Sequence, residues 1–342
     1  MTIEQGIAKV YNGVNHVVIL GAGASIASTI RNNEAGGKIL PSIHNFIDVI
    51  GLRDIVETMP EHLNFFNFEQ LYSNLIKNNH DSNEVREIER RITSYFSDMS
   101  LPKEPTIYDY LIASLRKKDL IATFNWDPFL FQAIKRNSKF TDNEPKVVFL
   151  HGNVAIGYNE QNNQYGPSGR HSYDDGAYFT PTKLLYPVEK KNYNDDKFIR
   201  TQWDLLEHRL NIKNGSARTT IFGYGAPNSD VEAVSLLSKS WGTPEAREME
   251  QFEIIDISPK DQLKKRWDKF IFSHHYDIVD NYFDSSLALN PRRTCESHLA
   301  HTQPFTIEEA FRNDNPVPQN FRTLQELWDW HSSLLRAENF SC

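Results

Sequence analysis

The sequence predicts an α/β fold: a Rossmann-like, doubly wound parallel sheet with a helical insertion and a helical C-terminal appendage. Three observations predict it. Short, continuously apolar segments alternate along the chain with helical patterns. Such segments lack polar alternation, as expected of strands whose two faces are both covered by helices. Glycine-rich turns follow two of them, at residues 21–25 and 223–225, which is typical of strand-to-helix turns in these sheets.

The predicted strands are short runs rich in β-branched and aromatic residues, each followed by a turn signal or a helix start. They cover residues 16–20, 120–124, 146–150, 219–222 and 252–257. Helical patterns follow the second, fourth and fifth of them, at residues 128–137, 231–240 and 260–270. Strands that alternate with helices pair in parallel, so their carboxyl ends meet at one edge of the sheet.

Three regions depart from this alternation. Residues 45–100 have helical periodicity with one apolar stripe that includes Val85, Ile88 and Ile92, which predicts a helical insertion at about 45–105. Residues 153–193 are rich in Gly, Asn and Tyr, which indicates a long loop with a hairpin. From residue 304 on, two capping-box patterns precede aromatic helices, Thr306 with Glu309 and Thr323 with Glu326.

We therefore expect two domains. Residues 1–289 form the sheet domain with its insertion, and residues 290–342 form the C-terminal helical appendage. The 342 residues, 39% of them hydrophobic, are enough for a sizeable core.

The composition also bears on partners and location. The net charge of −8 gives no overall field to hold nucleic acid, so direct nucleic-acid binding is not expected. No apolar run approaches the ~18 residues of a membrane span, and the N-terminus lacks a secretory signal pattern. The only cysteines, Cys295 and Cys342, cannot form a disulfide framework or a four-cysteine zinc site. We expect a cytoplasmic protein without a metal.

The first candidate site is the turn after the first strand, which contains Gly21, Ala22, Gly23 and Ser25. Glycines let the backbone turn sharply and approach a pyrophosphate, and a helix N-terminus attracts that anion. The pattern departs from the dehydrogenase fingerprint because Ile26 stands where the third glycine would be. A purely structural glycine turn is the alternative.

Polar residues also follow the second and third strands. Thr123, Asn125 and Asp127 lie at the end of one, and His151 ends the other in a His-Gly turn. Asn125 can orient a ribose hydroxyl or a water, and Asp127 can stabilise a cationic centre or cap the next helix. His151 is the side chain suited to proton transfer near neutral pH. We expect Asn125 and His151 at the ends of neighbouring or nearby strands, on the same edge of the sheet.

Two weaker candidates follow the fourth and fifth strands. Gly223 belongs to a second glycine-rich strand-to-helix turn. Asp256 ends the fifth strand, where its carboxylate can meet a ribose or serve only as a cap.

The motifs G-A-G-A-S, T-x-N-x-D, L-H-G and G-Y-G-x-P-x-S-D follow strands in this order. The combination resembles the Sir2, or sirtuin-like, domain over roughly residues 14–270. That resemblance implies NAD as the ligand. It places the NAD phosphates at Gly21, Ala22, Gly23 and Ser25, the nicotinamide ribose at Thr123, Asn125 and Asp127, and the catalytic base at His151. It brings Gly223 and Asp256 to the adenosine half.

The chain departs from the protein deacylases of that family because it has no cysteine between His151 and Cys295, where their zinc module would lie. It is more similar to the Sir2-like effectors of bacterial antiphage defence, which consume NAD. We expect hydrolysis of NAD to nicotinamide and ADP-ribose. The resemblance also implies a HerA-type ATPase as a candidate partner.

An enzyme that destroys NAD needs restraint, so we expect a homo-oligomer or a controlling partner. The alternatives are a non-catalytic NAD or ADP-ribose sensor, an NAD-dependent protein deacylase and an oxidoreductase. The missing zinc ligands disfavour the deacylase, and the broken third glycine disfavours the oxidoreductase.

Overall fold

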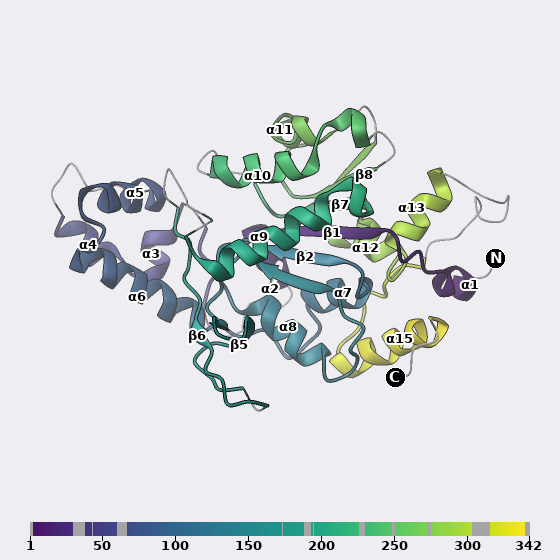
Figure 1. Ribbon diagram of the computed structural model, residues 1–342, viewed down its shortest axis with the longest axis horizontal. Coiled ribbons are helices and arrows are strands. Elements are labelled where there is room, and N and C mark those ends of the chain that lie inside the picture. The colour runs from purple at the N-terminus through teal and green to yellow at the C-terminus, as the bar shows by residue number, and fades with distance from the viewer. Residues whose placement is uncertain are drawn as a thin grey trace.

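The computed structural model describes residues 3–29, 38–42, 44–59, 67–172, 174–187, 193, 195–225, 230–247, 250–271, 275–302 and 315–338. Its centre is a six-stranded parallel sheet with strand order β3-β2-β1-β7-β8-β9 (Figure 1). The strands are β1 (Asn15–Leu20), β2 (Leu120–Thr123), β3 (Lys146–Phe149), β7 (Ser216–Phe222), β8 (Gln251–Ile255) and β9 (Tyr276–Val279). The predicted fold class is confirmed, and β9 is a sixth strand that the sequence analysis missed.

Helices cover both faces of this sheet. Along β1, Val18 and Leu20 face one apolar core, whereas Val17 and Ile19 face the other. Side chains alternate in this way because successive residues of a strand point to opposite faces. The first core includes helices α2 (Ala22–Thr29), α7 (Ile107–Ser114) and α8 (Phe129–Asn137), and the second includes α9 (Lys197–Leu210), α10 (Val231–Trp241) and α11 (Lys260–Arg266). In Figure 1, α7 and α8 lie below β1 and β2, whereas α10 and α11 lie above them.

The predicted insertion is helical. It contains α3 (Phe46–Ile50), α4 (Arg53–Glu57), α5 (Phe68–Asn79) and α6 (Asn83–Ser97), which lie together at one end of the molecule (Figure 1). The predicted stripe of Val85, Ile88 and Ile92 is buried along α6. Side-chain caps fix the helix starts, since Asn67 accepts from the backbone N–H of Glu69 and Ser82 from that of Val85.

The segment predicted as a loop with a hairpin contains a small antiparallel sheet. Its strands are β4 (Ile156–Asn159), β5 (Gln164–Pro167) and β6 (Thr180–Pro181), in the order β5-β4-β6. After β6 the chain returns to the turn at His151, where the backbone N–H of Leu185 donates to the carbonyl of His151 at 2.9 Å.

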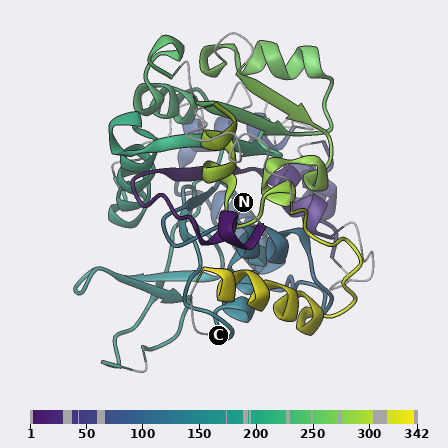
Figure 2. The same ribbon diagram turned by 90° about the vertical axis from the view of Figure 1, so that its right-hand side faces the viewer.

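The C-terminal segment packs on the sheet domain. It contains α12 (Ser286–Leu289), α13 (Thr294–Thr302) and α15 (Leu324–Ala337), and α15 contacts the N-terminal helix α1 (Ile3–Ala8), as Figure 2 shows. Thr323 caps α15, as predicted, whereas Thr306 and Glu309 lie outside the described residues. Glu338 is buried between the guanidinium groups of Arg292, at 2.8 Å, and Arg116, at 3.2 Å. The domain boundary at residue 290 stays a prediction.

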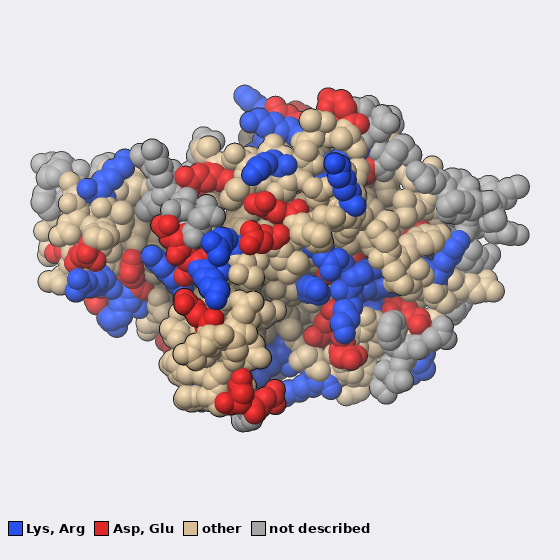
Figure 3. Space-filling view, in the orientation of Figure 1, with Lys and Arg blue, Asp and Glu red and all other residues tan. Residues whose placement is uncertain are grey.

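No helix of the described residues combines the length and the apolar character that a membrane crossing requires. On the face seen in Figure 3, Lys and Arg side chains lie interspersed with Asp and Glu side chains.

Candidate active site

The strand order creates a crevice between β1 and β7. From β1 the chain places β2 and β3 on one side of it, and later places β7, β8 and β9 on the other. Connections leave the sheet in opposite directions at such a switch point, which opens a crevice at the carboxyl ends of the strands. A cavity of about 420 Å³ lies there, lined by the predicted site residues Gly21, Ala22, Ser25, Asn125, Asp127, His151 and Gly223.

Two glycine turns form the floor of this crevice and pack directly against each other. The N–H of Gly23 donates to the carbonyl of Gly223 at 2.9 Å, and the N–H of Gly21 donates to the carbonyl of Phe222 at 3.0 Å. Gly223 has φ of 60°, and a Cβ there would collide with the backbone of Ala24. Glycine is therefore required where the backbones of the two turns touch, because a side chain would not fit between them.

This packing changes the interpretation of the first motif. The N–H groups of Gly21, Gly23 and Ala24 all donate to protein carbonyls, so they are not open donors for a pyrophosphate. Gly23 does not line the cavity, whereas Gly21, Ala22 and Ser25 do.

A buried polar network joins the first two motifs. Ser25 Oγ donates to Asp127 Oδ2 at 2.7 Å and lies 2.6 Å from the hydroxyl of Tyr108. Asn125 Nδ2 donates to the carbonyl of Gly21 at 2.8 Å and to Ser25 Oγ at 2.9 Å. Residues of α2, of α7 and of the segment after β2, distant in sequence, therefore share one set of hydrogen bonds beside the cavity.

Asp127 has two partners. Its Oδ1 accepts from the N–H of Phe129 at 3.1 Å, which supports the start of α8, and its Oδ2 accepts from Ser25. The Asp127 side chain thus both supports the start of α8 and lines the cavity. Burial raises the pKa of Asp127 from 3.8 to about 6, although these hydrogen bonds act in the opposite direction. The carboxylate is ionised at neutral pH but disfavoured by its dry surroundings.

His151 lies at the end of β3, on the strand beside Asn125, as predicted. Its Nε2 lies 3.0 Å from the hydroxyl of Tyr193, and its ring meets the edge of Phe124 at 4.8 Å between centroids. Gly152 has φ of 73°, and a Cβ there would collide with the carbonyl of Lys183. The His-Gly turn is therefore fixed from both sides.

Two predicted residues lie outside the cavity lining. Thr123 is fully buried, and its Oγ1 accepts from the N–H of Asn125 at 3.1 Å, so it shapes the end of β2. Asp256 follows β8, two strands from β1, and its Oδ1 accepts from the N–H of Ser258 at 2.8 Å. The Asp256 side chain thus closes the turn after β8, whereas α11 begins only at Lys260.

The sequence analysis missed the opposite wall of the cavity, which is aromatic. Phe46, Phe68 and Phe96 reach it from the insertion and Trp126 from the second motif. Phe46 stacks on Phe68 at 4.3 Å, and Trp126 lies edge-on to Phe46 and Phe96 at 6.3 and 6.1 Å. It also missed Tyr108 and Tyr193. The aromatic residues within the predicted insertion were the available signal, but nothing local shows which element they would face.

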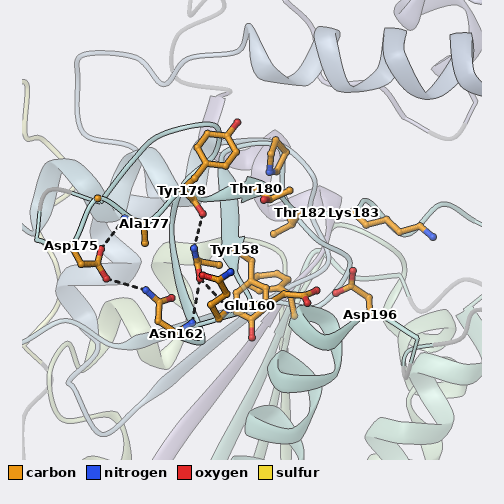
Figure 4. A pocket seen from close by; sticks show the side chains of 15 residues that line it. Tyr158, Glu160, Asn162, Asp175, Ala177, Tyr178, Thr180, Thr182, Lys183 and Asp196 are labelled. Atoms are coloured by element: carbon orange, nitrogen blue, oxygen red, sulfur yellow. Dashed lines mark hydrogen bonds between the residues drawn. The ribbon is translucent and has the colours of Figure 1, made fainter.

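A second cavity, of about 890 Å³, lies against the hairpin and shares no lining residue with the first (Figure 4). Asp175, one of its carboxylates, accepts from Asn162 Nδ2 and from the N–H of Ala177, both at 3.0 Å. These bonds hold the loops of the hairpin together.

Within the described part of the chain, no group of three or more His, Cys, Asp or Glu side chains is arranged to hold a metal ion. Cys295 is buried, and burial raises the pKa of its thiol.

No protein-family model and no curated protein matches the chain. The fold is similar to that of several solved structures. One is a Sir2 homologue–NAD complex, with a TM-score of 0.39, 12% identity, and coverage of 81% of this chain and 86% of that one. A mutant Sir2 homologue with 2′-O-acetyl ADP-ribose has a TM-score of 0.41, 10% identity, and coverage of 81% and 89%. Sir2 bound to acetylated peptide has a TM-score of 0.34, 13% identity, and coverage of 78% and 87%.

Proposed function

We propose that the protein hydrolyses NAD+ at the nicotinamide–ribose bond, releasing nicotinamide and ADP-ribose. One observation carries the proposal: Ser25, Asn125, Asp127 and His151 line one cavity at the switch point of the sheet. Their types and order along the chain match the Sir2-like pattern, and they combine a proton acceptor, an amide and a carboxylate beside an aromatic wall.

The chemistry follows from the substrate. The bond between the ribose C1′ and the pyridinium nitrogen breaks, and its electron pair neutralises the nicotinamide, so the leaving group needs no acid. The positive charge passes to the ribose as an oxocarbenium-like centre, which a water oxygen attacks. The carboxylate of Asp127 stabilises this charge across a dry site, where electrostatic interactions are strong. Asn125 orients the ribose and the water, and His151 accepts the proton.

The direct test is nicotinamide release from NAD+ by the purified full-length chain and by two histidine variants. A general base contributes about 10²–10⁴-fold, so His151→Ala should retain at most about 1% of the rate. His171→Ala is the matched control, because His171 is exposed on the hairpin. Equal turnover by His151→Ala at equal folding would refute the role of His151.

A second variant separates hydrolysis from simple binding. Asn125→Ala should bind ADP-ribose in calorimetry while losing most of its nicotinamide release. NAD+ binding by the unmodified chain with no nicotinamide release would favour the sensor. Transfer of an acetyl group from a lysine peptide would favour the deacylase.

We also propose that this activity serves antiphage defence and is restrained by assembly or by a partner such as a HerA-type ATPase. Both parts of this proposal rest on the resemblance of the motifs to the NAD-consuming Sir2-like effectors. Size-exclusion chromatography with light scattering on the full-length chain tests self-assembly, and a monomer at every concentration would contradict it.

A further inference from the structure

The hydrogen-bond donors and acceptors around Ser25 can be assigned one by one. Its Oγ lies within bonding distance of Asp127 Oδ2 at 2.7 Å, of the Tyr108 hydroxyl at 2.6 Å and of Asn125 Nδ2 at 2.9 Å. A serine hydroxyl has one hydrogen, and an ionised carboxylate can only accept. The hydrogen of Ser25 therefore goes to Asp127, and the hydroxyl of Tyr108 must donate to Ser25.

The same reasoning fixes the amide of Asn125. Because the hydrogen of Tyr108 points to Ser25, the Tyr108 oxygen can accept from Asn125 Nδ2, which lies 3.2 Å away. The same amide hydrogen also points to Ser25 Oγ, 2.9 Å from the nitrogen, and is shared between these two oxygens, whereas the other amide hydrogen donates to the carbonyl of Gly21 at 2.8 Å. A flipped amide would bring two acceptors together at that distance, so the flip is excluded. The nitrogen is used by the protein, and the oxygen Oδ1 is the polar atom that Asn125 can offer to a ligand.

We propose that Tyr108 is a positioning residue, whose hydroxyl holds Ser25 and Asn125 so that the amide oxygen of Asn125 faces the reacting ribose. This inference rests on the proposed function. An amide oxygen accepts a hydrogen from water or from a ribose hydroxyl, and its partial negative charge stabilises an oxocarbenium-like centre. The amide NH2 group, which has partial positive charges, would do the opposite.

Tyr108 is suited to this role by its place in the fold. It lies on α7, a helix whose residues are all buried, and its own side chain is 0% exposed. Tyr108 does not line the cavity and therefore acts through Ser25 and Asn125. Burial and the charge of Asp127 raise the pKa of its hydroxyl above its ordinary value, so it stays protonated and can donate at neutral pH.

The experiment compares Tyr108→Phe with Tyr110→Phe. Both tyrosines are 0% exposed on α7, but Tyr110 packs against the rings of Phe283 and Phe321, which do not line the cavity. Misplacing a catalytic amide reduces kcat by about 10- to 100-fold, whereas KM should change by no more than about threefold. Tyr110→Phe should keep both constants. Equal kcat in the two variants would overturn the proposal.

A second readout does not depend on turnover. The side-chain amide of Asn125, observed by NMR in asparagine-labelled full-length chain and assigned with Asn125→Asp, should exchange its protons slowly. Exchange should become about fivefold faster in Tyr108→Phe and stay slow in Tyr110→Phe. Unchanged exchange in Tyr108→Phe would overturn the proposal even if the chain released no nicotinamide. Absence of release from the unmodified chain would instead count against the proposed function.

Discussion

The substitution Asp127→Asn should inactivate the protein and stabilise its fold at neutral pH, because the carboxylate is held where its charge is disfavoured. Asparagine has nearly the same shape and no charge. Burial raises the folded-state pKa of Asp127 to about 6, above its ordinary value of 3.8. Between these values the folded state holds a proton that the unfolded state has lost, so stability falls as pH rises.

The size of this effect follows from the two pKa values. A difference between 3.8 and about 6 corresponds to about 3 kcal/mol of lost stability, present in full above pH 6 and absent below pH 4. Asparagine has no charge and therefore removes this loss of stability. It also loses one of the two hydrogen bonds, from Ser25 or from Phe129, which costs about 1 kcal/mol. The variant should therefore be about 2 kcal/mol more stable at pH 8 and about 1 kcal/mol less stable at pH 4.

Urea unfolding at pH values from 4 to 8 measures this crossover directly. Asp329→Asn, on an exposed position of α15, is the matched control and should change the free energy of unfolding by less than about 0.5 kcal/mol throughout. Nicotinamide release by the unmodified chain should rise with pH through about 6, as the carboxylate ionises. If Asp127→Asn shifts the stability by one constant amount at every pH, the reasoning about a buried charge is wrong.

Two further predictions concern the stability of the fold. Gly223→Ala should destabilise the fold by about 2 kcal/mol or more, since its Cβ would collide with the backbone of the first glycine turn, whereas Gly225→Ala meets its nearest neighbour only at 3.5 Å. Glu338→Ala should lower the free energy of unfolding by about 3–5 kcal/mol, because it removes the carboxylate paired with the buried guanidinium of Arg292 and one of the two carboxylates paired with Arg116, which keeps Glu296. Chemical denaturation checks both, and a change below about 1 kcal/mol in Glu338→Ala would show that the two arginines find other acceptors.

The fold could be predicted from sequence because strands buried on both faces produce continuous apolar runs. All five predicted strands are present, and β1 is buried throughout. The strand β9 was missed because the residues Tyr276–Val279 lie at the edge of the sheet, partly exposed, with the polar Asp277 among them. An edge strand of four residues is formed by pairing with β8, and the sequence does not show that pairing.

The site could be predicted only in part. Asn125, Asp127 and His151 follow strands, and strand ends of a parallel sheet meet at one edge, so their proximity follows from sequence order. Tyr108 and Tyr193 could not be found this way, because each reaches the site from a segment whose path is set by tertiary packing. The sequence also cannot distinguish a glycine that approaches a ligand from one that approaches another backbone.

The helical insertion belongs to the site rather than to a separate module. Its rings at Phe46, Phe68 and Phe96 line the cavity opposite the polar network, and the stacked pair at 4.3 Å leaves these rings little freedom to move apart. The chain then leaves the insertion directly into α7, which places Tyr108 against Ser25. One continuous segment thus supplies both the apolar wall of the cavity and the tyrosine hydroxyl that bonds the polar wall, so a shift of the insertion would change the apolar lining and the orientation of the amide together.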